Sequence, residues 1–352
     1  MLKTIVLTLS LLVVAPTVHA QQLNFEPCYA FWKLTDRLRE GVKLTAEDWQ
    51  QVKETDGYKR VNKAAWNQFV QQVTLVYSPG NQERIQQEMK TDRSLQRIIR
   101  YAQEEARLKN YIATIDQLHL MDSAMAYTKR MLPQKWKNCF PAPKVDFILY
   151  NYDGSAREYG VTMDLLMSCD METYRPGAFL GHELLHYALF YCRIKLRHFK
   201  AVPQEQQAAF VAINGISEEG IADLIDKPFV LFDEQSPYRE KEAFLSLYQT
   251  QSSVCIAKLN QAFEQLADQA REPYTSFSYW NSIVQATGHV PGMYMGRLIQ
   301  QQGLTDELIQ HIDNPFVFFY LYNKAARKAV NGSPEFSQKA LRFLKSMEKR
   351  HY

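Results

Sequence analysis

Five consecutive residues in the middle of the chain carry the side chains best suited to chemistry: His182-Glu183-Leu184-Leu185-His186. On a helix, residues four apart project from the same face, so the imidazoles of His182 and His186 can bind one cation while Glu183 lies beside it. With a third protein ligand, one coordination position stays open for water, which zinc makes acidic enough to act as a nucleophile near neutral pH. The pattern therefore predicts a catalytic zinc site. The alternative is a pair of ordinary core histidines.

A third ligand is expected from a later segment. A third histidine would require glycine at position 189 and histidine at 192, but the chain has Leu189 and Cys192 there, which excludes the three-histidine type of site. Acidic residues follow in Ser217-Glu218-Glu219-Gly220-Ile221-Ala222-Asp223. On a helix Glu218 and Glu219 project about 100° apart, and spacing alone does not choose between them.

With these residues the chain resembles the gluzincin clan of metallopeptidases, in which a glutamate from a later helix completes the H-E-x-x-H site. Members similar to thermolysin have an aspartate four residues after that glutamate, and it orients one of the ligating histidines. Glu219 and Asp223 match this spacing. The resemblance implies that His182, His186 and Glu219 bind Zn²⁺, and that Asp223 accepts the other ring N–H of a ligating histidine.

The resemblance is not uniform along the chain. The separation between His186 and Glu219 is longer than in thermolysin or in the aminopeptidases of the clan. In this respect the chain is more similar to a group of uncharacterised bacterial zinc-dependent peptidases. These share a later Pro-Gly-x-Tyr segment, here Pro291-Gly292-Met293-Tyr294-Met295-Gly296, and an early Asp56-Gly57-Tyr58. The similarity is firm over residues 145–226 and loose elsewhere.

The reaction that this resemblance implies is hydrolysis of a peptide bond. Glu183, beside the metal and not bound to it, would take a proton from the attacking water and pass it to the leaving amine. Peptidases of this type also use a tyrosine or histidine from the later lobe to stabilise the oxyanion. Tyr294 and His289 are the candidates, although a packing role fits Tyr294 as well.

Hydrophobic periodicity and turn residues predict the first elements around these side chains. Apolar residues three and four apart predict mostly helix from Pro27 to about Lys137. Val145 to Tyr150 and Gly160 to Met167 are rich in β-branched and aromatic residues and predict two strands. Asp153-Gly154 is a turn signal between them, so a small antiparallel sheet is expected directly before the H-E-x-x-H segment.

Two helices should then carry the metal ligands. One is predicted from about Ala178 to Leu196, and the other from Gln204 to Ile225, ended by Lys227-Pro228. The rest of the chain reads as helix with several breaks, one of them at Gly288 to Gly292. The strand Gly160 to Met167 is a candidate for binding an extended peptide along its edge, although burial of that edge fits equally.

We therefore predict an α+β fold, predominantly α-helical, in which a zincin-like catalytic core with a small antiparallel sheet lies between N- and C-terminal helical lobes. The predicted boundaries are 1–20 for a signal peptide, 21–140 for the N-terminal helical region, 141–228 for the core and 229–352 for the C-terminal lobe.

The first twenty residues have the features of a secretory signal peptide. They contain Lys3, an apolar run from Ile5 to Val14, and the small-residue ending Val18-His19-Ala20. This run is short for a membrane anchor. We expect export to the periplasm or the medium, where disulfides can persist. The chain has five cysteines, an odd number, so at least one stays outside any intrachain pair.

Composition limits the partners. The formal net charge of +3 argues against nucleic acid as the main partner, and no later apolar run is long enough to span a bilayer. A peptide or protein substrate and a zinc cofactor are expected, with the oligomeric state and the cleavage preference left open. Two other hypotheses remain: a zinc-binding but non-hydrolytic periplasmic interaction protein on the same scaffold, and an all-helical binding protein without a metal.

Overall fold

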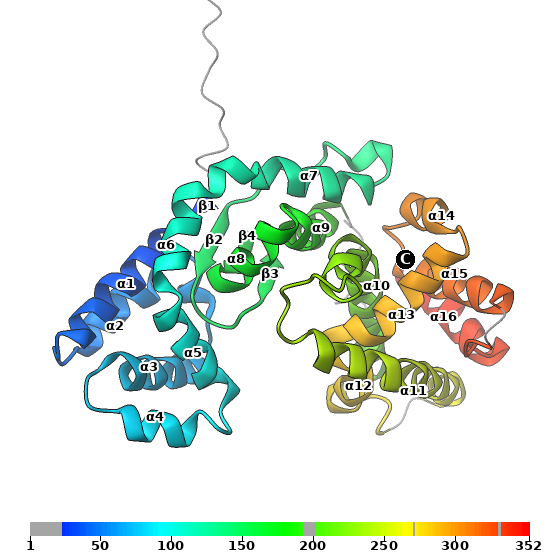
Figure 1. The fold of residues 1–352 in the computed structure, drawn as a ribbon. Coiled ribbons are helices and arrows are strands. Elements are labelled where there is room, and N and C mark those ends of the chain that lie inside the picture. Colours follow the sequence, from blue (N-terminus) through cyan, green and yellow to red (C-terminus); the bar gives the residue numbers. More distant parts are fainter. Residues whose placement is uncertain (1–22, 193–201, 270–271, 330–331) are drawn as a thin grey trace, which may run out of the picture.

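The protein is described by a computed structural model over residues 23–192, 202–269, 272–329 and 332–352. It is predominantly helical with a small mixed sheet, and the predicted α+β class is confirmed. In Figure 1 the helices of the first third lie on one side of the sheet and those of the last third on the other. The predicted signal peptide lies outside the described residues.

The helices predicted between Pro27 and Lys137 are present. Their bounds are α1 Glu26–Arg39, α2 Ala46–Lys53, α3 Lys63–Tyr77, α4 Gln82–Glu88, α5 Arg93–Gln103, α6 Glu105–Thr114 and α7 Leu120–Arg130. The start of α2 is fixed by a capping box, in which the Thr45 hydroxyl accepts the Asp48 N–H and the Asp48 carboxylate accepts the Thr45 N–H. Helix α7 crosses the top of the molecule in Figure 1 and packs against α9 (Ala178–Cys192).

The sheet is mixed, so the prediction of an antiparallel sheet is wrong. Its strands are β1 Leu23–Asn24, β2 Val145–Ile148, β3 Gly154–Arg157 and β4 Gly160–Asp164, in the order β1-β2-β4-β3. Asp153-Gly154 leads into the additional strand β3, which returns the chain, so that β4 runs parallel to β2 and antiparallel to β3.

The strand predicted to Met167 ends at Asp164 instead. The Asp164 carboxylate accepts the backbone N–H groups of Leu166 and Met167, which caps helix α8 (Leu165–Tyr174). A side-chain cap of this kind satisfies the first unpaired N–H groups of a helix and so favours its start at this point. The apolar residues after Asp164 therefore belong to a buried helix and not to a strand.

The two helices predicted to carry the metal ligands are α9 and α10 (Gln204–Val230). The predicted end of the first at Leu196 lies outside the described residues. The second runs past its predicted end at Lys227-Pro228. Pro228 has no N–H to donate within the helix, but it lies near the C-terminal end of α10, and the helix continues to Val230. There the Leu231 N–H donates to the Lys227 carbonyl oxygen at 2.9 Å.

The last third of the chain is helical. Its elements are α11 Lys241–Asp268, α12 Phe277–Val284, α13 His289–Gln301, α14 Thr305–Gln310, α15 Pro315–Lys328 and α16 Gln338–His351. The predicted break at Gly288 to Gly292 is shorter than expected, because α13 begins at His289 and contains Gly292. The break is the turn at 285–288, in which all four residues have positive φ.

Helices α10 and α13 cross at glycines, which lets their backbones touch. A Cβ atom on Gly220 would lie 2.5 Å from the carbonyl oxygen of Gly292, and one on Gly292 would lie 2.8 Å from the Gly220 nitrogen. Gly296 also approaches the Gly220 carbonyl. The glycines of the Pro291–Gly296 segment therefore serve to bring α13 directly against α10.

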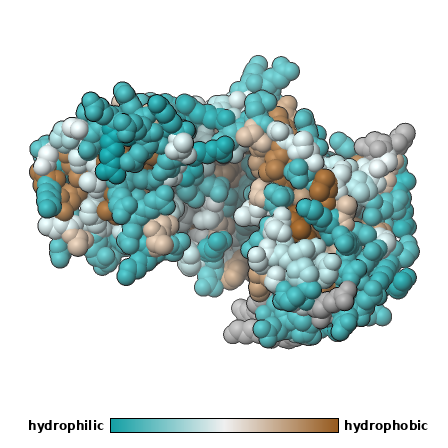
Figure 2. Space-filling model, turned by 90° about the horizontal axis from the view of Figure 1, so that it is seen from below, coloured by the Kyte–Doolittle hydropathy of each residue, from teal (hydrophilic) through white to brown (hydrophobic). Residues whose placement is uncertain are grey.

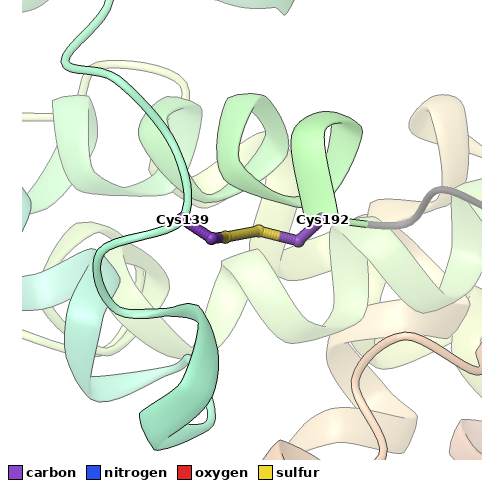
Figure 3. Close-up of a disulfide and its surroundings, with 2 residues drawn as sticks. All are labelled: Cys139 and Cys192. Atoms are coloured by element: carbon purple, nitrogen blue, oxygen red, sulfur yellow. A yellow bond between two sulfur atoms is a disulfide. The ribbon is translucent and has the colours of Figure 1, made fainter.

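One disulfide joins Cys139, in the loop before β2, to Cys192, the last residue of α9 (Figure 3). Cys28, Cys169 and Cys255 are buried free thiols. The disulfide ties the end of the H-E-x-x-H helix to the segment that enters the sheet.

Across the described ranges, none of the helices combines the length and the apolar character needed to cross a membrane.

Gly220→Ala should lower the free energy of unfolding by about 1–3 kcal/mol, because the added methyl group would push the α10 and α13 backbones apart. Gly215→Ala on the same helix is the matched control, since a Cβ atom there meets only the Thr287 carbonyl oxygen at 3.8 Å. It should leave stability unchanged or raise it by up to about 1 kcal/mol. Urea denaturation followed by circular dichroism measures both, and equal effects would contradict the glycine contact.

Candidate metal centre

Helix α9 is fixed at its N-terminus and along one side. The two carboxylate oxygens of Glu172, on α8, accept the backbone N–H groups of Gly177 and of Leu180, the latter at 2.6 Å. Farther along, Thr128 on α7 donates its hydroxyl to the carbonyl oxygen of Gly181 at 3.0 Å. These contacts fix the depth and rotation of α9 just ahead of its first histidine.

The structure brings together His182, His186 and Glu219. The two Nε2 atoms are 3.1 Å apart, and Oε2 of Glu219 lies 3.4 Å from that of His182 and 3.3 Å from that of His186. The contact between the two imidazoles has hydrogen-bond geometry, whereas the two contacts of Glu219 are ion pairs. Within the described residues Glu219 Oε2 is a buried oxygen with no hydrogen-bond partner. Of the two glutamates that the sequence left open, Glu219 therefore has an oxygen within reach of both imidazoles.

The other ring nitrogen of His182 is held by Asp226. His182 Nδ1 donates to Asp226 Oδ1 at 2.9 Å, because an ionised carboxylate can only accept. Asp223, predicted for this role, lies 3.8 Å from the same nitrogen and instead accepts from His289 Nδ1 at 2.9 Å. Glu219, Asp223 and Asp226 are spaced four and three apart, so all three share one face of α10. That spacing is the signal that could have identified Asp226.

A buried lysine holds the two aspartates in place. Lys227 Nζ lies 2.8 Å from Asp226 Oδ2 and 3.3 Å from Asp223 Oδ1. Burial alone would raise the pKa of Asp226, but the charges of Lys227 and His182 hold that pKa well below its usual range. Burial alone would lower the pKa of Lys227, but Asp226 and Asp223 raise it above its usual value. Lys227 and Asp226 therefore stay charged at neutral pH.

The cluster formed by His182, His186, Glu219 and His289 favours the binding of positive charge. Burial alone would raise the pKa of Glu219, but His186 and His289 hold it well below its usual value. Burial alone would lower the pKa of His182, but the charge of Asp226 raises it well above its usual value. Protons satisfy this preference when no other cation is bound, and a metal ion would displace them.

Glu183 lies beside this cluster and lines a cavity of about 720 Å³. The side chain is 5 % exposed, and burial raises its pKa. It packs against Gly154 at the start of β3, where a Cβ atom would lie 2.7 Å from Glu183 Oε1. A side chain at position 154 would displace the Glu183 carboxylate, so glycine is required there.

The cavity lies between β3, α9, α10 and the turn before α13. Its lining residues are Asn151, Asp153 to Tyr159, His182, Glu183, His186, Phe190, Glu218, Glu219, Thr287 and His289. Viewed from below, the molecule is hollowed between its two halves (Figure 2). The strand proposed from sequence for edge pairing, β4, is central in the sheet, whereas β3 is the outer strand that borders the cavity.

The two candidates for oxyanion stabilisation lie in different places. His289, the first residue of α13, lines the cavity, and its Nδ1 is 3.3 Å from Glu219 Oε2. Tyr294 is farther along α13, where its hydroxyl donates to Ser333 Oγ at 3.1 Å and its ring packs near Tyr248. In this structure Tyr294 has the contacts of a packing residue, the alternative that the sequence left open, and it is not among the residues that line the cavity.

A second, overlapping set of groups could also hold a cation. One ligand atom each from His182, Glu219, Asp223 and His289 lie within 4.8 Å of one another. In this set, however, Asp223 Oδ1 is already paired with Lys227 and His289. A carboxylate beside a buried ammonium group is a weaker metal ligand, because a cation bound there would be repelled by that charge.

The chain was compared with known protein families and with known proteins. A family model described as "Putative zinc dependent peptidase (DUF5700)" matches residues 44–331, most of the chain. The chain belongs to this family. No curated protein and no solved structure matches it. The family description names zinc dependence and peptidase activity, and the matched range includes α9, α10 and α13.

The ligand set His182, His186 and Glu219 fits a zinc ion. Zinc binds nitrogen and oxygen at about 2.0–2.2 Å, and the edges of a regular tetrahedron of that size are about 3.3–3.6 Å long. The three observed separations are 3.1, 3.3 and 3.4 Å. The buried Oε2 of Glu219, which has no hydrogen-bond partner in the described part of the chain, keeps its lone pairs for a cation.

Glu172 should make a measurable, pH-dependent contribution to stability. Burial raises the pKa of this carboxyl to about 8, although the N–H groups of Gly177 and Leu180 favour its ionised form. A glutamate in the unfolded chain titrates near about 4.3. The folded chain therefore holds an extra proton between these pH values, and this contribution falls as the pH rises through that window.

Glu172→Gln cannot ionise, so its free energy of unfolding should decline less than that of the parent between about pH 5 and pH 8. Urea denaturation at a series of pH values measures the difference. Glu83→Gln, at an exposed position on α4, is the control and should follow the parent. Parallel curves for the parent and Glu172→Gln would rule out the raised pKa.

Proposed function

We propose that the chain is an exported zinc-dependent metallopeptidase of the gluzincin type, with His182, His186 and Glu219 as zinc ligands. The observation that carries the proposal is the spacing of the three ligand atoms, which fits one tetrahedral zinc, next to a buried glutamate in an open cavity. Membership of a family described as zinc-dependent peptidases supports it independently.

In this proposal Glu183 is the general base. A zinc ion held by the three ligands would acidify water and polarise a substrate carbonyl. Glu183 takes a proton from the attacking water and passes it to the leaving nitrogen, and its raised pKa suits both steps. Gly154 supports this role because it gives the carboxylate room against β3.

The neighbouring residues orient and donate. Asp226 fixes the His182 tautomer, because its carboxylate accepts a hydrogen bond from Nδ1–H, so that the Nε2 lone pair is left for the metal. His289, held by Asp223, is the proposed donor to the developing oxyanion from the α13 side of the cavity. Among the described residues strand β3 pairs with a neighbouring strand on one side alone, and its outer edge beside the cavity suits an extended peptide or protein substrate.

Export is part of the proposal. The apolar run and small-residue ending of residues 1–20 support a cleaved signal peptide. The disulfide between Cys139 and Cys192 supports an oxidising compartment such as the periplasm or the medium, since such bonds are rare in reducing cytosol.

Glu183→Gln should lower kcat/KM for peptide hydrolysis by at least about 100-fold while the zinc content stays the same, because it removes the proton acceptor and no ligand. Digestion of a broad peptide library read by mass spectrometry, with zinc measured by elemental analysis, tests this. Tyr294→Phe is the control and should leave the rate unchanged, since that hydroxyl bonds Ser333. Parent protein that holds zinc but cleaves nothing would favour the non-hydrolytic alternative.

Glu219→Ala should lose most of its zinc, whereas Glu218→Ala should retain it, because the Glu219 Oε2 atom lies within 3.4 Å of both imidazoles. Zinc stoichiometry after dialysis against a weak chelator measures both variants. The two residues are adjacent and both line the cavity, so they are a matched pair. Equal retention of zinc would exclude Glu219 as the third ligand.

A further inference from the structure

Two large aromatic side chains stay exposed where they line the cavity. Phe190, on α9, is 49 % exposed, and Tyr159, in the turn between β3 and β4, is 51 % exposed. Single exposed apolar residues are common on protein surfaces and need no explanation. These two differ because both border the same cavity as His186 and Glu183, which is otherwise lined mainly by polar groups.

The two aromatics lie at the same end of that cavity. Strand β3 and helix α9 run side by side, and the contacts between them advance together along both elements. Gly154 meets Glu183 at one end, and the Tyr191 hydroxyl donates to the Glu158 carbonyl oxygen at 3.3 Å at the other. Tyr159 and Phe190 are sequence neighbours of this second contact, one helical turn beyond His186.

The position of the Tyr159 ring is fixed by Arg60. The guanidinium of Arg60 lies over the Tyr159 ring, 4.2 Å from its centroid. Arg60 is itself anchored, because it donates to Asp146 Oδ2 at 2.9 Å and to Thr162 on the central strand. A ring held in this way presents its remaining exposed surface without a large loss of side-chain freedom when it binds a partner.

We propose that Phe190 and Tyr159 form a subsite that accepts a large apolar or aromatic side chain of a peptide bound in the cavity. The proposal rests on the proposed function for the identity of the ligand, and it adds the class of side chain that the cleft selects. The subsite lies one helical turn beyond His186, at the C-terminal end of β3. A peptide extended along β3 past the metal ligands would place one side chain between the two rings.

Peptide binding tests the subsite without requiring hydrolysis. The Glu183→Gln chain, loaded with zinc, is titrated with blocked, fluorescein-labelled octapeptides of alanine and serine in which one position carries Phe, Leu, Asp or Lys. Fluorescence anisotropy should show that Phe or Leu at one position binds roughly ten-fold or more tightly than Asp there, as expected for an apolar side chain entering an apolar subsite.

Phe190→Ser and Tyr159→Ser, added to this background, should remove the preference at that position. Phe277→Ser and Tyr29→Ser are matched controls, since these residues are 47 % and 55 % exposed and do not line this cavity. The proposal is overturned if no position prefers an apolar residue, if no peptide binds, or if the control variants lose the preference equally. Parent protein that binds such peptides but does not cleave them would leave the subsite standing and reject the hydrolytic function.

Discussion

The arrangement depends on one carboxylate oxygen that is buried among imidazoles. Oε2 of Glu219 has a nitrogen of His182, His186 and His289 within 3.4 Å and lacks a hydrogen-bond partner in the described chain. A buried charge of this kind costs several kcal/mol unless positive charge compensates it. The histidines or a bound cation must supply that positive charge. The close packing of α9, α10 and α13 therefore depends on all of these groups being present together.

The packing of those helices follows from small residues at their contacts. Gly181 lets α9 approach α7, and Gly220 with Gly292 lets α10 touch α13. The same crossing places His289, at the first turn of α13, next to Asp223. Backbone contacts of this kind leave little freedom for a helix to slide or rotate. The polar groups of the centre are thus positioned by the close backbone contacts of the helices that carry them.

The sequence was informative where the pattern is local. The spacing of His182 and His186 on one helix face needs no tertiary knowledge. The partner of each aspartate depends instead on how α10 is rotated against α9 and α13, and periodicity does not specify that rotation. Asp226 was therefore missed, and Asp223, predicted to orient a ligating histidine, accepts from His289 in the structure. Strand β3 was missed because Gly154–Arg157 has little intrinsic strand preference and forms through pairing with β4.

The disposition of the centre along the chain has a consequence for biosynthesis. The imidazole pair on α9 lies in the middle of the chain, its carboxylate follows on α10, and His289 comes only with α13. Domains emerge from the ribosome in chain order, so a nascent or truncated chain that ends before α13 has an incomplete constellation. A nascent chain therefore passes through most of its synthesis before all the groups of the centre can meet.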